Sequence, residues 1–127
     1  GVEEYAHRPL AELSGGTRQR CFLAMTLAQD PEIFLLDEPT SFLDPLHQLR
    51  LLELCRELAA EGKAVAVVLH DLPLALRYAD RAAVMKDGQL LAVDSPERLL
   101  ERGILEQVFG VKILGVDTPE GRSYVCI

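Results

Sequence analysis

Hydrophobic and polar positions along the chain follow two different patterns, and together they predict a mixed α/β fold. Apolar residues recur at helical spacing after residues 14–16 and again after Asp44 and Pro45. Residues 33–36 and 64–69 are instead wholly apolar, as is typical of strands buried on both faces of a parallel sheet. The order strand, helix, strand predicts a βαβ unit whose two strands are parallel and joined by a right-handed crossover.

The two longer helices have recognisable ends. The first is predicted over residues 17–29 and stops at Asp30 and Pro31. The second starts with Asp44 as N-cap and Pro45 in the first helical position, and it ends at Gly62. The apolar face of each helix is predicted to consist of Cys21, Ala24, Met25 and Ala28 in the first, and Leu51, Leu54, Cys55 and Leu58 in the second.

The last part of the chain predicts short helices and two antiparallel hairpins. A helix is expected over residues 72–79, a second after Ser95 and Pro96, and a further turn or two up to Phe109. Strands over residues 81–86 and 89–94 flank an Asp-Gly turn, and strands over 111–117 and 122–127 flank a four-residue turn. The fold class is therefore α/β, with a partial parallel sheet followed by a C-terminal antiparallel hairpin region.

Composition excludes several classes of protein. A chain of 127 residues has room for one domain with a core. A net charge of −7 argues against a nucleic-acid partner, and no apolar run reaches the roughly 20 residues needed for membrane insertion. The three cysteines lack metal-site spacing and are expected to be buried thiols in a reducing compartment. Because the chain starts with Gly1 rather than Met, it is expected to be a piece of a longer protein.

Candidate catalytic residues follow the two apolar strands. Asp37 and Glu38 come at the carboxyl end of the first strand, where open α/β sheets bind ligands. One such carboxylate can hold Mg²⁺ and the other can orient a water, although any strand turns polar before a loop. His70 ends the second strand, from which it could reach the space in front of Glu38 and contact a phosphate oxygen. Alternatively, His70 is a loop residue before the helix cap Asp71.

A phosphate-binding helix N-terminus is the other candidate. Ser14, Gly15 and Gly16 precede the first helix, whose free N–H groups and dipole attract anions. The alternative interpretation is a plain helix cap. His7 and His47 belong to no motif, and we assign them no role.

Taken in order, the segments LSGGTRQR, IFLLDEPTSFLD and VVLHD resemble the motifs of the ATP-binding cassette (ABC) ATPases, which are P-loop NTPases. Residues 13–16 match the signature motif and residues 33–37 the Walker B strand. Glu38 matches the catalytic carboxylate, residues 41–44 the D-loop, and His70 the switch histidine.

The resemblance implies a mechanism in which two nucleotide domains pack head to tail with ATP between them. It implies that Ser14, Gly15 and Gly16 touch the γ-phosphate of ATP held by the partner domain. The remaining implied roles are Mg²⁺ organisation for Asp37, water polarisation for Glu38, γ-phosphate contact for His70, and a link between the two sites for Asp44.

The C-terminal segments point to a subfamily. ADRAAVMKDGQLLAVDSPERLL resembles the region after the switch histidine in importer ATPases, and LEQVFGVKILGVDTPEGRSYVCI resembles the ending of those serving ferric-siderophore, haem and cobalamin uptake. This resemblance implies transmembrane permease subunits as partners and a cytoplasmic location on the inner face of the cell membrane.

The phosphate loop G-x-x-x-x-G-K-[ST] is absent, because Gly62 and Lys63 are followed by Ala64. Residues 1–127 are therefore expected to be the C-terminal portion of one ABC ATPase domain, with negligible ATP binding or turnover alone. Exposed strand edges predict an oligomer. Two alternatives remain: a non-transport ABC ATPase of the chromosome-maintenance or repair type, and a truncated binding or regulatory module without hydrolysis of its own.

Overall fold

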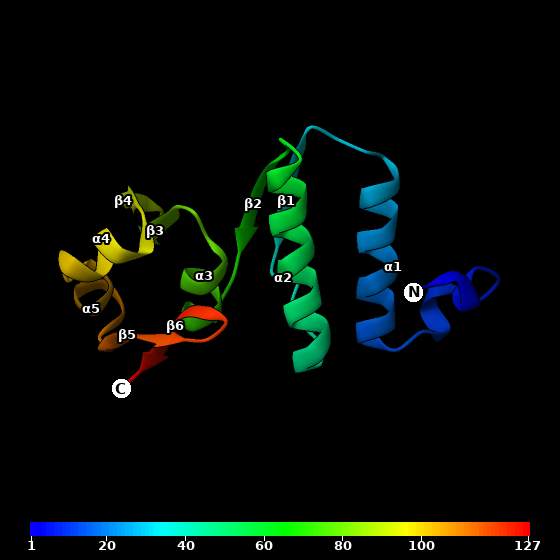
Figure 1. The fold of residues 1–127 in the computed structure, drawn as a ribbon. Coiled ribbons are helices and arrows are strands. Elements are labelled where there is room, and N and C mark those ends of the chain that lie inside the picture. The colour runs from blue at the N-terminus through cyan, green and yellow to red at the C-terminus, as the bar shows by residue number, and fades with distance from the viewer. The chain divides into compact units, whose positions relative to one another are not determined.

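A computed structural model describes all of residues 1–127, and the chain divides into two compact units, Gly1–Leu69 and His70–Ile127 (Figure 1). The first unit opens with two 3₁₀ turns, Glu3–Tyr5 and Leu10–Glu12. It continues with helix α1 (Gly15–Ala28), strand β1 (Ile33–Asp37), helix α2 (Pro45–Ala60) and strand β2 (Ala64–Val68). The predicted order of strand, helix and strand is confirmed.

The two strands of the first unit form the predicted parallel pair. Their register runs from Ile33 opposite Ala64 to Asp37 opposite Val68, so both strands end at the same edge of the sheet. Helix α2 connects them and starts as expected, with Asp44 as N-cap and Pro45 in the first helical turn. The backbone then turns at Gly62, whose φ of +92° is the left-handed conformation that favours glycine.

Only one face of this sheet is covered, which corrects the expectation of strands buried on both faces. Phe34 is 2% exposed, whereas its neighbours Ile33 and Leu35 are 62% and 77% exposed. Successive side chains of a strand point to opposite faces. The buried core on the covered face contains Leu43, Leu51 and Cys55, and no other element of the first unit buries the opposite face. A wholly apolar run therefore does not reveal what lies on each side of it.

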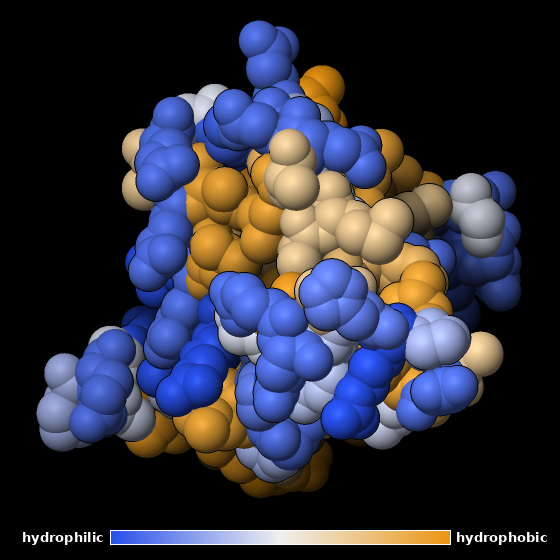
Figure 2. All heavy atoms as spheres, turned by 90° about the vertical axis from the view of Figure 1, so that its right-hand side faces the viewer, coloured by the Kyte–Doolittle hydropathy of each residue, from blue (hydrophilic) through white to orange (hydrophobic).

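The predicted buried face of α1 is also wrong. Met25 is 55% exposed, and no residue of the helix is fully buried. The residue that packs against the core is Leu23. Between positions 22 and 28 every residue except Thr26 is apolar, so the spacing of apolar residues does not select one face of the helix. Figure 2 views the molecule from the α1 side of Figure 1 and shows apolar surface exposed between hydrophilic side chains.

The second unit consists of short elements. Helix α3 (Leu72–Tyr78) precedes the hairpin of β3 (Ala82–Lys86) and β4 (Gln89–Asp94), and helices α4 (Pro96–Glu101) and α5 (Ile104–Phe109) precede the hairpin of β5 (Ile113–Thr118) and β6 (Gly121–Cys126). Both hairpins are antiparallel, as predicted. Asp87 and Gly88 both have positive φ angles, 49° and 75°, which is the requirement of a tight hairpin turn.

One apolar cluster forms the core of the second unit. It consists of seven buried residues from the helices and both hairpins: Leu76, Val84, Ala92, Leu99, Leu105, Ile113 and Tyr124. The Tyr124 hydroxyl donates a hydrogen bond of 3.1 Å to Oε1 of Glu97 in α4. This hydrogen bond ties the last strand to a helix of the same core.

The cysteines are free thiols in different environments. Cys55 is buried, and burial raises the pKa of its thiol. Cys21 is half-buried and Cys126 is exposed, so the expectation of buried thiols holds for Cys55 and is wrong for Cys126. None of the helices is long and apolar enough to cross a lipid bilayer.

Candidate nucleotide site

The acidic pair predicted at the end of the first strand lies at the carboxyl edge of the parallel sheet. Asp37 is the last residue of β1, and its side chain is exposed. The backbone N–H of Glu38 donates to the carbonyl oxygen of Val68 at 3.1 Å, which extends the pairing with β2 by one bond. The backbone at both carboxylates is therefore anchored to the sheet.

Glu38 adopts an uncommon backbone conformation. Its φ is +47°, a left-handed value that costs of order 1 kcal/mol or more in a non-glycine residue. The turn that follows holds it in place, because Ser41 N–H donates to the Glu38 carbonyl at 3.1 Å and Ser41 Oγ donates to Oε2 at 3.4 Å. Pro39 within this turn is fully buried. The chain thus turns sharply out of the strand at the residue predicted to be catalytic.

Helix α1 presents the three signature residues at its N-terminus. Ser14 is the N-cap, and its Oγ accepts from the N–H of Thr17 at 3.2 Å, so the alternative interpretation of Ser14 as a cap is confirmed. The N–H groups of Gly15 and Gly16 belong to the first turn and have no acceptor within the helix. Ser14 and Gly15 are exposed. Such amides are donors of the kind that phosphate groups accept from at helix N-termini, and the contact of Ser14, Gly15 and Gly16 with a phosphate stays a prediction.

The D-loop packs directly against this helix terminus. A Cβ on Gly16 would lie 2.7 Å from the carbonyl oxygen of Phe42, whereas a Cβ on Gly15 would lie 3.4 Å from Cβ of the same residue. Phe42 has a φ of +66° and is 83% exposed. Gly16 is therefore required by the close approach of the loop, in addition to any role toward a phosphate.

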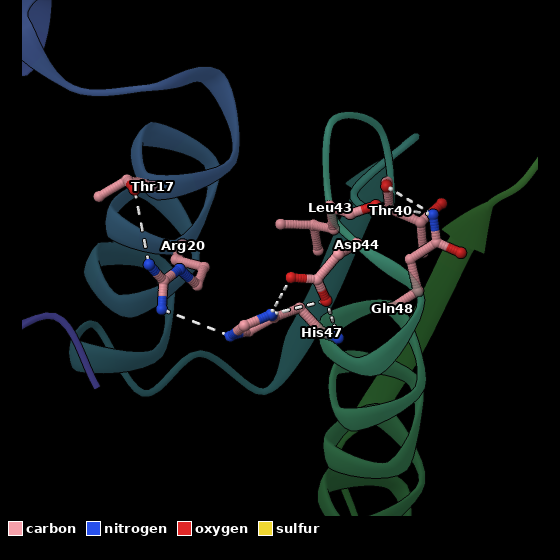
Figure 3. Close-up of polar contacts among 7 residues, drawn as sticks. All are labelled: Thr17, Arg20, Thr40, Leu43, Asp44, His47 and Gln48. Carbon is pink, nitrogen blue, oxygen red and sulfur yellow. Dashed lines mark hydrogen bonds and ion pairs between the residues drawn. The ribbon is translucent and has the colours of Figure 1, made fainter.

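Side-chain amides hold carbonyl groups of the D-loop and of the turn that precedes it. Nε2 of Gln48 donates to the carbonyl oxygens of Leu43 at 3.0 Å and Thr40 at 3.4 Å (Figure 3). Nε2 of Gln19 in α1 donates to the Pro39 carbonyl at 3.4 Å. Both flanking helices thus fix the conformation of the loop.

His47, to which the sequence assigns no role, contacts the D-loop carboxylate. Its Nδ1 lies 2.8 Å from Oδ1 and 2.9 Å from Oδ2 of Asp44, and its backbone N–H donates to Oδ1 at 2.9 Å (Figure 3). That backbone hydrogen bond, followed by the one from the ring, lowers the pKa of Asp44. The detectable signal was the spacing Asp-x-x-His, because a polar side chain at the third helical position can reach back to the cap.

Arg20 joins this pair to helix α1. Its Nη1 lies 3.4 Å from Nε2 of His47, and its Nη2 donates to Oγ1 of Thr17 at 3.5 Å (Figure 3). Its guanidinium group also lies over the ring of Tyr5, 6.0 Å from the centroid. The contact between Arg20 and His47 spans 27 positions in the sequence.

No group of three or more His, Cys, Asp or Glu side chains is arranged to hold a metal ion. Mg²⁺ does not need such a cage, because it keeps several waters and binds one or two carboxylates together with substrate phosphates. The single exposed carboxylate of Asp37 fits that coordination chemistry.

The predicted site residues fall into two groups. Ser14, Gly15, Gly16, Asp37, Glu38 and Asp44 all lie in the first unit, where the signature helix and the D-loop are in contact. His70 is exposed and begins the second unit, so its approach to Glu38 stays a prediction.

Comparison with known proteins relates the chain to the ATP-binding proteins of ABC transporters. Residues 1–41 match the family described as ABC transporter. The chain is 44% identical to the "Achromobactin transport ATP-binding protein CbrD" of Dickeya dadantii (strain 3937), covering all of this chain and 48% of that protein. It is 47% identical to the "Petrobactin import ATP-binding protein FpuD" of Bacillus anthracis, covering all of this chain and 47% of that protein. The chain spans about half the length of these relatives.

Solved structures share the fold. A metal-chelate type ABC transporter in an inward-facing conformation superposes with a TM-score of 0.80 and 23% identity over 98% of this chain and 51% of that one. A dimeric, post-hydrolysis ATP-binding cassette bound to ADP and phosphate superposes with a TM-score of 0.69 and 35% sequence identity. This match covers 74% of this chain and 40% of that one. Together with the signature helix and the acidic strand end, these similarities relate the chain to the ATP-binding proteins of ABC transporters and show the fold of their ATPase domains.

Proposed function

We propose that the chain is the C-terminal portion of the ATP-hydrolysing subunit of an ABC importer for ferric siderophores or related iron chelates. The observation that carries the proposal is the direct contact between the signature helix and the D-loop. The carbonyl oxygen of Phe42 lies so close to Gly16 that there is no room for a Cβ on that residue. The names of the two relatives, one for achromobactin transport and one for petrobactin import, support the substrate class.

The N-terminus of α1 is proposed to bind the γ-phosphate of ATP held by a second nucleotide domain. The amides of Gly15 and Gly16 donate hydrogen bonds, and the helix dipole adds favourable charge. Ser14 Oγ donates to Thr17 Oγ1 at 2.9 Å, and rotation of this hydroxyl would make it a further donor to phosphate. This site offers donors without a lysine, which agrees with a phosphate whose main binding loop belongs to the other domain.

The edge of the sheet is proposed to carry the hydrolytic chemistry. Asp37 would help to hold Mg²⁺, which when bound neutralises charge on the phosphate oxygens. Glu38 would accept a hydrogen bond from the attacking water and orient it, since its anchored backbone directs the side chain out of the strand. His70 would donate a hydrogen bond to a phosphate oxygen, and Asp44 would link the two sites of a dimer.

Partners and location follow from the same proposal. A second ATPase domain would complete each nucleotide site, and the solved cassette with ADP and phosphate is such a dimer. Transmembrane permease subunits would hold the ATPase at the inner face of the cell membrane. We propose that the chain alone self-associates through the free edges of the two-stranded β1–β2 sheet, next to the exposed side chains of Ile33 and Leu35. Sedimentation showing a monomer would exclude this self-association.

The experiment joins the chain to the part of a relative that the chain does not match. A hybrid in which these 127 residues replace the matched segment of the Dickeya relative is expected to hydrolyse MgATP. Glu38→Gln, which keeps the size of the side chain but not its charge, should lower the rate by at least about 100-fold. Arg50→Ala on the exposed surface of α2 serves as the control and should leave the rate unchanged. An unaffected rate in the Glu38→Gln hybrid would exclude the proposed role of Glu38.

The comparisons do not favour the non-transport alternative, because both relatives are named as transport or import proteins. A regulatory module without hydrolysis would instead bind an intact ATPase domain. In that case the hybrid would hydrolyse no ATP, whereas the isolated chain would bind the intact Dickeya relative.

A further inference from the structure

The ring of His47 contacts a loop carboxylate on one side and helix α1 on the other. Nδ1 contacts both carboxylate oxygens of Asp44, at 2.8 and 2.9 Å, and Nε2 lies 3.4 Å from Arg20 (Figure 3). The His47 side chain is 31% exposed, compared with 61% for Asp44. The imidazole is therefore the better enclosed member of the pair and the one that can hold the other.

The contacts continue through α1 to the signature motif. Arg20 Nη2 donates to Thr17 Oγ1 at 3.5 Å, and the same oxygen accepts from Ser14 Oγ at 2.9 Å. An unbroken series of polar contacts thus joins Ser14 to Asp44 within one chain. The two ends of this series are the two residues that the family resemblance assigns to the signature and to the D-loop.

The chemistry of the groups sets the direction of these hydrogen bonds. A guanidinium group has only donors, so the Nε2 of a neutral His47 ring accepts from Arg20. Nδ1 then carries the proton and donates to the Asp44 carboxylate. This is a single, defined tautomer, and it places one acceptor toward α1 and one donor toward the D-loop.

We propose that His47 is a positioning residue that fixes Asp44 relative to the helix beginning at Ser14. A displacement of the signature end would then be transmitted to the D-loop carboxylate through Arg20 and His47. The inference rests on the proposed function where it concerns hydrolysis. It concerns a histidine that neither the motif resemblance nor the comparisons assign.

The competing explanation is that His47 only completes the cap of α2. These two roles separate, because the cap hydrogen bond uses the backbone N–H of His47, which alanine retains. Removing the ring therefore removes the contacts to the Asp44 carboxylate and Arg20 but leaves the backbone cap in place. His7 is exposed and lies outside this series of contacts, so His7→Ala is a matched control.

The first test measures hydrolysis by the hybrid. We expect His47→Ala to lower kcat about fivefold, with KM for ATP changed less than about twofold, because the ring is partly exposed and such contacts are individually weak. His47→Asn, whose amide can still donate to Asp44, should recover about half of the lost rate. Arg20→Ala should add little to the effect of His47→Ala, since both disrupt the same series. His7→Ala should match the parent hybrid.

The result that overturns the proposal is a His47→Ala hybrid with the kcat of the parent while Glu38→Gln remains inactive. That outcome leaves the proposed function standing and reduces His47 to a cap residue. Independent, additive losses from Arg20→Ala and His47→Ala would also contradict it.

A second test does not depend on hydrolysis. In ¹⁵N-labelled full chain, the ring of His47 should show the Nδ1-protonated tautomer, and His47→Ala should shift the amide signals of both Asp44 and Ser14. His7→Ala should shift neither. If the Ser14 signal stays in place in the His47→Ala chain, the transmission from D-loop to signature does not exist, whatever the hybrid does with ATP.

Discussion

The two units of the chain are stabilised by different kinds of contact. In His70–Ile127, seven buried residues form one apolar cluster. In Gly1–Leu69 the corresponding cluster has three buried residues, and the loop at its edge is held by hydrogen bonds from side-chain amides and a histidine. The two units also differ in their non-glycine residues with left-handed backbone. The first unit has three, Asp30, Glu38 and Phe42, of which the last two lie in that loop, whereas the second has only Asp87, in a hairpin turn.

This difference indicates that the second unit is a stable scaffold and that the first unit contains the segments that move during function. Apolar clusters resist opening, whereas segments held by partly exposed hydrogen bonds belong to the least stable parts of a protein. Every predicted site residue except His70 lies in the first unit. We therefore expect local opening to concentrate at residues 38–44 and the second unit to stay closed.

The largest predicted effect is the loss of the second core. Leu99 has no exposed surface, so Leu99→Ala removes buried volume and leaves a cavity that should cost about 3 kcal/mol or more. Amide hydrogen exchange on the full chain should show lost protection throughout residues 70–127. Protection in α2 and the β1–β2 pair should persist if the units are stabilised separately.

Leu91 provides the comparison for this variant, since it is a leucine of the same unit that is 47% exposed. Leu91→Ala should change the free energy of unfolding by no more than about 0.5 kcal/mol. If Leu99→Ala instead lowers protection equally in both units, they form one cooperative structure, and the contrast between them disappears.

A smaller effect is expected where the first unit is packed most tightly. Gly16→Ala places a Cβ 2.7 Å from the Phe42 carbonyl, and the loop has to move at a cost of about 1–3 kcal/mol. Urea unfolding should show the lower free energy of unfolding of the first unit, and the amide signals of residues 40–44 should shift. Because the readout is stability, it does not depend on the role of the glycine toward phosphate.

Gly15→Ala tests whether this effect is specific. A Cβ at position 15 meets the Phe42 side chain at 3.4 Å, an ordinary contact, and alanine is a better helix former than glycine. The free energy of unfolding should therefore change by less than about 0.5 kcal/mol. Equal losses from both variants would show that the loop does not distinguish the two glycines.

Local signals in the sequence predict the elements well. Asp44 and Pro45 mark the start of α2, Ser95 and Pro96 mark that of α4, and Asp87-Gly88 forms the expected hairpin turn. Each of these signals acts within a few residues, through a cap, a fixed φ angle or a left-handed turn. The order of helices and strands from residue 15 onward therefore follows from short stretches of sequence.

Burial and polar contacts across the unit could not be predicted in the same way. The exposure of Ile33 and Leu35 depends on which elements lie over the sheet. The sequence of the strand does not specify those elements. The role of His47 depends on Arg20, a residue 27 positions earlier that only the packing of α1 beside α2 brings near. Motif matching finds residues that contact a ligand. It does not find residues such as His47, which contact and orient those residues.

The smallest predicted effect concerns the hydrogen bond between Tyr124 and Glu97 in the second unit. Tyr124→Phe keeps the buried ring and removes the hydroxyl that donates to Glu97, so it should cost about 1 kcal/mol. Desolvation, followed by the hydrogen bond to Glu97, raises the pKa of Tyr124 above its ordinary value of 10.0. The contribution of the protonated Tyr124 hydroxyl to the free energy of unfolding is therefore complete below pH 10. It is lost as the pH rises through the folded-state pKa.

Urea unfolding of the second unit from pH 8 to pH 11.5 should accordingly show two features. The wild-type chain should lose its advantage over Tyr124→Phe progressively above pH 10, and the two stability curves should converge at the upper end. Glu97→Gln, which keeps an acceptor without the charge, should retain part of the advantage and weaken the pH dependence. A constant difference between wild type and Tyr124→Phe across this range would mean that the hydroxyl ionises equally in the folded and unfolded chain, and the second core would then depend on apolar packing alone.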